Sequence, residues 1–239
     1  MKKWAFTLGE VLITLTIIGV VVMLFAPSMV SNTADKARMT ALKGTMLDLN
    51  NAMQSYMIKH HLTNLESMEI SPKYGVPFIV EYTYDQNDEM TDFDEKLALK
   101  KNEDGTIKEF DIENINYNSL YGKNFNSANF TSKFDSAKVY LNNGVGLAFC
   151  STATKYDNED FYEILIDVNG NEPPNVIGLD AFVAYLAIET NVEKAITAGQ
   201  LYGFPEPGGQ AVPACNGGDG KSCLYLAEQS GYNPKYHKQ

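Results

Sequence analysis

The sequence lacks the motifs of the common enzyme classes. It contains no G-x-S-x-G elbow, no glycine-rich phosphate-binding loop and no HExxH zinc motif. Histidine is scarce: His60 and His61 are adjacent and so point in different directions on a helix, and His237 lies in the tail. Acidic residues are abundant, but abundance does not pair a general acid with a general base. We therefore expect no enzymatic activity, and a signal-anchored membrane enzyme is the least favoured alternative.

Runs of lysine or arginine are also missing. The formal net charge is -11 at pH 7, and an acidic surface repels the phosphate backbone, so nucleic acid is not an expected partner. The chain has 239 residues, of which 44% are hydrophobic. That is enough for one sizeable domain with an accessory segment.

Cysteine is rare, with only Cys150, Cys215 and Cys223. If the body lies outside the cytoplasm, Cys215 and Cys223 can pair around the glycine-rich segment CNGGDGKSC. Closing so short a loop stabilises a fold by roughly 2 to 3 kcal/mol on the chain-entropy model. Cys150 ends an apolar run and is expected to be a small buried hydrophobic residue.

Charged residues are absent from Val11 to Ala34. The run VLITLTIIGVVVMLFAPSMV supplies the ~20 apolar positions that a helix needs to cross a bilayer. A secretory signal peptide has a shorter apolar core and an Ala-x-Ala-like cleavage site, which this segment does not match. Lys2 and Lys3 precede the span, so we expect a cytoplasmic N-terminus and an extracytoplasmic body.

Two residues do not suit a plain membrane anchor. Glu10 places a carboxylate at the start of the apolar run, where it costs free energy to bury and calls for a partner. Pro27 lacks an amide hydrogen and crowds the preceding turn, so it predicts a local bend in the helix.

The segment AFTLGEVLITLTIIGVV resembles the prepilin N-terminal motif of type IV pilins and of the pseudopilins of type II secretion. The resemblance implies a leader peptide of residues 1–5, removed by a prepilin peptidase between Ala5 and Phe6, and N-methylation of Phe6. Glu10 then becomes the fifth mature residue, and Pro27 falls where the family commonly carries a helix-bending proline. The family usually has glycine before the cut, where this chain has Ala5.

Charge neutralisation gives this pattern a physical meaning. Cleavage creates an ammonium group on Phe6 within the apolar layer, and Glu10 of a neighbouring subunit can pair with it. The expected partners are therefore the peptidase, the membrane and other pilin or pseudopilin subunits, in a homopolymer or a heteropolymer.

Beyond the membrane segment the chain becomes amphipathic. One apolar stripe has helical spacing and comprises Met39, Leu42, Met46, Leu49, Met53 and Met57. We interpret it as the packed face of a spine helix rather than as a metal or haem site. The predicted parts are a transmembrane and filament-core helix over 6–34, a spine helix over 35–62 and a globular head over 63–239.

The head is predicted to contain an antiparallel sheet over 138–188 and a variable region over 85–129. Strands are expected at 76–84, 138–141, 145–150 and 161–168, a short helix near 93–101, and a surface loop over 116–129. Residues 181–188 form either another strand, which we favour, or a helical turn. A tight hairpin turn is expected at Asn142–Gly144. A long N-terminal helix on such a sheet is the pilin-like α+β fold class.

The loop DVNGNEPPNVIGLD resembles a pattern in the heads of pseudopilin-like proteins. Its oxygen-bearing side chains are Asp167, Asn169, Asn171, Asn175 and Asp180. They could hold Ca²⁺, which favours such hard ligands, although the spacing is not that of an EF-hand. The alternative, which we favour, is a turn with side-chain-to-backbone hydrogen bonds and no cofactor.

Taken together, these patterns favour a structural subunit of a type IV pilus-like or pseudopilus filament in the bacterial inner membrane. The alternative is a minor pilin or adhesin-type binding module at a filament tip, because variable loops can carry binding specificity. The sequence does not separate a secretion pseudopilus from a type IV pilus or a DNA-uptake filament.

Overall fold

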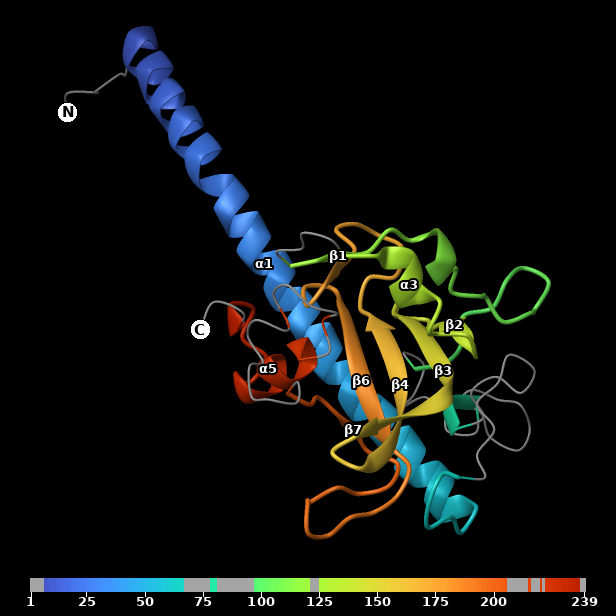
Figure 1. Cartoon of the computed structure of the whole chain (residues 1–239). Helices are drawn as coiled ribbons and strands as arrows, with labels where there is room; N and C mark the ends of the chain where they lie inside the picture. Colours follow the sequence, from blue (N-terminus) through green and yellow to red (C-terminus); the bar gives the residue numbers. More distant parts are fainter. Residues whose placement is uncertain are drawn as a thin grey trace. The chain divides into compact units, whose positions relative to one another are not determined.

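The computed structural model describes residues 7–66, 78–80, 97–120, 125–205, 215, 220 and 222–236, and within the first helix it leaves out the side chains of residues 26–31. The chain divides into two compact units, Met1–Ala37 and Arg38–Gln239. The second unit contains a mixed β-sheet packed on a helix (Figure 1), which agrees with the predicted α+β class.

One helix, α1 (Leu8–Lys59), covers both the predicted membrane segment and the predicted spine. Its backbone is helical through Pro27, whose side chain lies outside the described residues. It ends where His61 adopts a φ of 53°, and Lys59 in the last turn faces the negative end of the helix dipole.

The spine part of α1 buries the predicted stripe. Met39, Leu42, Met46, Leu49, Met53 and Met57 are all 7% exposed or less. Polar side chains of the same helix also anchor the head, since Asn50 Oδ1 accepts the Leu201 amide at 2.7 Å and Gln54 Nε2 donates to the Ala198 carbonyl at 3.0 Å. The stripe was therefore correctly interpreted as core.

Seven strands form the sheet: β1 (Asn118–Ser119), β2 (Lys138–Tyr140), β3 (Gly146–Tyr156), β4 (Glu159–Asp167), β5 (Val176–Ile177), β6 (Ala181–Ala187) and β7 (Leu201–Tyr202). Their order is β1-β5-β6-β4-β3-β2, with β7 paired to β6. The pairs β2–β3, β3–β4, β4–β6 and β6–β7 are antiparallel, whereas β1–β5 and β5–β6 are parallel. The four strands predicted between 138 and 188 are confirmed, and the two parallel pairings were not foreseen.

Tight turns join the central strands. Gly144 has a φ of 91° in the turn between β2 and β3, as the Asn142–Gly144 composition predicted. Asp157 and Asn158 both have positive φ, 49° and 66°, between β3 and β4. Positive φ at both central residues suits the right-handed twist of a two-residue hairpin.

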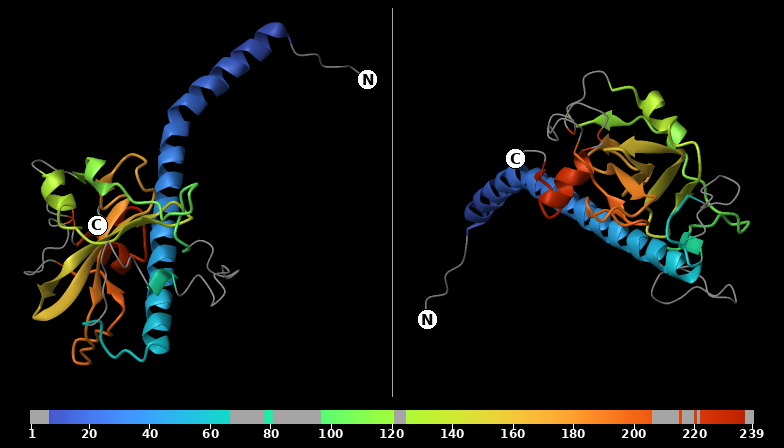
Figure 2. Two further views of the ribbon diagram at one scale, coloured as in Figure 1. Left: turned by 90° about the vertical axis from the view of Figure 1, so that its right-hand side faces the viewer. Right: turned by 60° about the horizontal axis from the view of Figure 1, so that its bottom comes forward.

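Both faces of the sheet are covered. Alternate residues of the strands, such as Leu147, Ile164 and Phe182, join α1 in one core, while Ala148, Leu165 and Val183 join a second core on the opposite face. The second core is closed by residues 110–117 and 125–134, which contain a 3-10 helix η1 (Ile112–Asn114) and a helix α3 (Ser127–Thr131). Figure 2 shows the sheet between these layers. Cys150 is buried in this second core, as expected.

Three predictions in the head were wrong. Residues 78–80 are helical with Phe78 and Ile79 buried, and the rest of the strand predicted at 76–84 lies outside the described residues. The described part of the helix predicted near 93–101 is not helical: residues 97–98 form a turn and a bend, and Leu99 and Lys101 form bridges to Leu141 and Ile107. The segment 116–129 is not simply a surface loop, because it contains β1, the start of α3 and the fully buried Tyr117.

Candidate functional site

The first candidate site is the apolar half of α1. Every side chain from Thr7 to Phe25 is exposed, and Leu12 and Ile17 are each 58% exposed. Leu8–Phe25 is the one helix segment long and apolar enough to cross a membrane among the residues that the structure describes. A contiguous apolar surface of this length is costly in water, so the segment is consistent with a single-pass membrane protein.

The polar groups inside this segment are satisfied by the helix itself. Thr14 Oγ1 donates to the Glu10 and Val11 carbonyls, both at 2.9 Å, and Thr16 Oγ1 donates to the Leu12 carbonyl at 2.8 Å. A hydroxyl that bonds back to its own helix presents no unpaired donor to lipid. The two threonines are therefore compatible with the span.

Glu10 closes a capping box at the start of α1. Its Oε2 accepts hydrogen bonds from the Thr7 amide and the Thr7 hydroxyl, both at 2.9 Å, and the Glu10 amide donates to Thr7 Oγ1 at 3.3 Å. Such a box satisfies two of the unpaired amides of a helix N-terminus. Both of these hydrogen bonds are accepted by Oε2, so Oε1 accepts no hydrogen bond within the capping box. The predicted processing residues Ala5 and Phe6 lie outside the described residues.

The second candidate site is the polar turn, defined as residues 167–180 between β4 and β6. Asp180 is fully buried, and its two oxygens accept the backbone amides of Asn175 at 2.8 Å and Val176 at 2.7 Å. Burial raises the pKa of this carboxyl, while these two amides act in the opposite direction. Asp180 therefore fixes the backbone of the turn as a hydrogen-bond acceptor.

Asp167 lies at the other end of the polar turn and is also fully buried. Its Oδ2 accepts the Tyr117 hydroxyl at 2.7 Å, and its Oδ1 accepts the Asn169 amide at 3.3 Å. Desolvation is the main cause that raises the pKa of Asp167 to about 7; the Tyr117 hydrogen bond lowers it and the charge of Asp180 raises it further. Sequence analysis missed Tyr117, because it contacts Asp167 from 50 residues away.

The asparagines considered as Ca²⁺ ligands divide into two groups. Asn171 is exposed and accepts the Tyr140 hydroxyl. Asn169 donates through Nδ2 to the Glu172 and Pro173 carbonyls, and the Oδ1 atoms of Asn169 and Asn175 are buried without a partner. Both carboxylates already accept backbone or tyrosine donors, and the described residues include no group of three or more His, Cys, Asp or Glu side chains placed to hold a metal. The geometry is that of a hydrogen-bonded turn.

A C-terminal clip holds the polar turn from outside. The predicted disulfide Cys215–Cys223 forms, and both sulfurs are buried. Cys223 begins a helix, α5 (Cys223–Gln229), that sequence analysis did not foresee. Gly178 has a φ of 89°, and a Cβ there would lie 2.6 Å from Cys223 Sγ, so the close approach of the disulfide requires glycine. Tyr236 completes the clip by donating its hydroxyl to the Gly178 carbonyl.

Removing the disulfide should lower the stability of the head. For Cys215→Ala with Cys223→Ala we expect the free energy of unfolding of the full chain in mild detergent to fall by roughly 2 to 3 kcal/mol, because the closed loop no longer restrains the unfolded chain. Urea unfolding followed by near-UV circular dichroism measures the change. Cys150→Ala, which leaves the clip intact, is the matched control. Equal stability of the double variant and the parent chain contradicts the assigned role of the clip.

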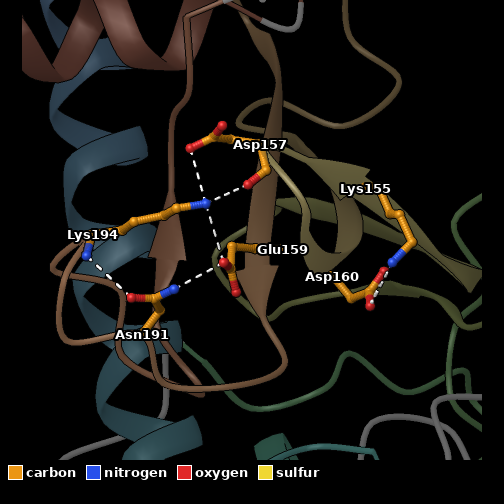
Figure 3. A network of polar contacts seen from close by, with 6 residues as sticks. All are labelled: Lys155, Asp157, Glu159, Asp160, Asn191 and Lys194. Carbon is orange, nitrogen blue, oxygen red and sulfur yellow. Dashed lines mark hydrogen bonds and ion pairs between the residues drawn. The ribbon is translucent and has the colours of Figure 1, made fainter.

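A surface network fixes the loop between β6 and β7. Lys194 Nζ lies 3.0 Å from Asp157 Oδ2 and 3.1 Å from Glu159 Oε1, and it also donates to the Asp157 carbonyl (Figure 3). Asn191 Nδ2 donates to the same Glu159 Oε1 at 2.9 Å, and Asn191 Oδ1 accepts the Lys194 amide at 3.2 Å. Hydrogen bonding to Asp157 is the main cause that raises the pKa of Lys194. The loop is thereby tied to the β3–β4 hairpin.

Comparison with known proteins identifies no relative of this chain. The chain matches no protein-family model, no curated protein and no solved structure. Function is therefore argued from the residues and their geometry.

Proposed function

We propose that this chain is a structural subunit of a type IV pilus-like or pseudopilus filament. The observation that carries the proposal is α1, whose apolar segment Leu8–Phe25 is exposed while its later stripe from Met39 to Met57 is buried under a sheet. One helix thus offers an apolar rod to lipid or to other subunits and also serves as the spine of a head. A helix with an exposed apolar first part and a buried later part suits a filament subunit better than a soluble binding protein.

Glu10 supplies the assembly chemistry in this proposal. A leader of residues 1–5 is removed by prepilin peptidase, and the methylated ammonium of Phe6 meets the Glu10 carboxylate of a neighbouring subunit. The capping box orients Glu10 at the helix start and engages its Oε2. The box leaves Oε1 able to accept a charge-assisted hydrogen bond from an ammonium group. Pairing between subunits would remove the cost of an isolated carboxylate in the apolar layer.

The proposed location is the bacterial inner membrane, with a cytoplasmic N-terminus and an extracytoplasmic head. Lys2 and Lys3 before the span support that orientation. The disulfide Cys215–Cys223 supports an oxidising environment for the head, since such bonds persist outside the cytoplasm.

A minor subunit with a binding role at the filament tip is the second candidate. It is favoured by residues 110–117 and 125–134, which cover the face of the sheet opposite α1 and form more than a simple connection. The copy number of the chain in purified filaments separates the two: a main structural subunit is the most abundant component, whereas a tip subunit is present in a few copies per filament.

Processing is the direct test of the proposal. Mass spectrometry of the membrane-associated protein should find a mature chain that starts at N-methylated Phe6. The control is the same protein from cells without prepilin peptidase, which should retain Met1–Ala5. An intact leader in cells with active peptidase contradicts the proposal.

A further inference from the structure

The outward face of the spine helix carries exposed apolar side chains and a glycine that the packing of its own chain does not explain. We define the spine face as Thr40, Lys43, Gly44, Leu47, Asn51, Ser55 and Ile58, which recur at helical spacing opposite the buried stripe. Leu47 is 60% exposed and Ile58 is 74% exposed, although the remaining positions are small or polar. The face carries Lys43, whose Nζ lies 5.9 Å from the centre of the Tyr232 ring of the same chain, and no carboxylate, on a chain whose net charge is -11.

Gly44 adds an independent observation. It lies inside α1, where glycine is less favourable than alanine, and a Cβ there would meet nothing within 4 Å. Packing within the chain therefore gives no reason for glycine at this position. Close approach of another molecule does, because a missing side chain leaves a shallow notch beside Leu47.

A complementary surface lies on the clamped loop, defined as residues 189–197 between β6 and β7. Its tip is closed by mutual backbone hydrogen bonds between Asn191 and Ile196, both at 2.9 Å, and Lys194 ties it to the β3–β4 hairpin (Figure 3). Val192 at the tip is 86% exposed, and the exposed carboxylates Glu189 and Glu193 flank it. The clamped loop thus presents an apolar knob with acidic neighbours, held in one conformation before any partner binds.

We propose, resting on the filament function above, that the spine face of one copy docks the clamped loop of a second copy, with Val192 packing beside Leu47 and Glu193 facing Lys43. The occupant is a second copy because the two surfaces are complementary in both charge and apolar character and belong to the same chain. Two different patches that recognise each other make a heterologous contact, which propagates as an open filament instead of closing into a dimer. The Lys43–Glu193 pair sets orientation more than affinity, since an exposed ion pair is weak.

Cysteine cross-linking in intact filaments tests the contact. Full-length chain carrying Leu47→Cys and Val192→Cys should give a ladder of disulfide-linked multimers on a non-reducing gel after mild oxidation, because each copy is linked at two different patches. Either substitution alone should give no cross-linked multimers, because the contact then places no second introduced cysteine beside the first. Leu47→Cys with Ile107→Cys is the matched control, since Ile107 is also an exposed apolar residue at 42% but lies outside the clamped loop.

Charge reversal and notch filling give a second readout. Lys43→Glu and Glu193→Lys should each reduce the yield of multimers, and the double reversal should restore it. Gly44→Leu should leave the folded head intact, because the space beside Gly44 is open, yet reduce the yield as well. Normal filaments with a mature N-terminus, no Leu47–Val192 ladder and no effect of the three substitutions would overturn the docking model while leaving the filament function standing. Absence of filaments from the parent chain would overturn both.

Discussion

Glu10→Gln is expected to insert in the membrane and to lose filament assembly, with the yield of sheared filaments falling by at least about tenfold. The substitution separates charge from capping. Glutamine at this position of a capping box still accepts the Thr7 amide, so the start of α1 is kept. Only the negative charge is removed, and with it the partner for the Phe6 ammonium of the neighbouring subunit.

Two matched variants sharpen this experiment. Thr7→Val removes the hydroxyl that donates to Glu10 Oε2 but keeps the carboxylate, so assembly should be reduced less than in Glu10→Gln. Thr14→Val removes a hydroxyl that bonds only to backbone carbonyls and should leave assembly unchanged. Membrane fractionation checks insertion, and shearing followed by immunoblotting measures filaments. Normal filaments from Glu10→Gln would rule out charge pairing as the basis of assembly.

Periodicity made the spine and the central sheet predictable. The stripe from Met39 to Met57 has the 3.6-residue spacing of a helix with one buried face, and all six of its members are buried. The runs at 145–150, 161–168 and 181–188 are rich in β-branched and aromatic residues and became β3, β4 and β6. Local pattern sufficed because each of these elements buries a continuous face.

The second core could not be predicted from local composition. Residues 116–129 are rich in asparagine and serine, which is typical of loops, yet Tyr117 and Phe125 pack in the second core. The sequence feature that predicts a second core lies in β6 instead. Every residue of β6 is buried, so both of its faces must pack against other parts of the chain. The run AFVAYLA shows no alternation of apolar and polar residues, a pattern that predicts burial on both faces.

The polar turn was predicted only in part. Its aspartates and asparagines favour side-chain-to-backbone hydrogen bonds, and Asp180 does accept two backbone amides. The contact of Asp167 with Tyr117 joins residues far apart in the chain, so no spacing rule reveals it. The electrostatics of the site therefore became visible only in the fold.

That electrostatic environment makes the stability of the head depend on pH, through Asp167. Burial raises the pKa of its carboxyl to about 7 in the folded chain, whereas an unfolded aspartate titrates near ~3.9. Between these two values the folded state holds a proton that the unfolded state has released. The slope of the unfolding free energy against pH is then negative in this window, and stability contributed by the protonated form is lost as pH rises from about 4 to about 7, by up to about 1.4 kcal/mol per pH unit.

Asp167→Asn should flatten this slope between pH 5 and pH 7, because the amide stays neutral and its oxygen can still accept the Tyr117 hydroxyl. Urea unfolding of the full chain in mild detergent at several pH values measures it. Glu228→Gln tests a second buried carboxyl: burial raises the pKa of Glu228 to about 7 as well, while the Gly203 amide that it accepts at 3.1 Å lowers that pKa. Each variant should remove part of the slope, and the double variant more than either alone. A slope in Asp167→Asn equal to that of the parent chain would show that Asp167 is ionised across this range, and that the polar turn stabilises its charge by contacts other than those described here.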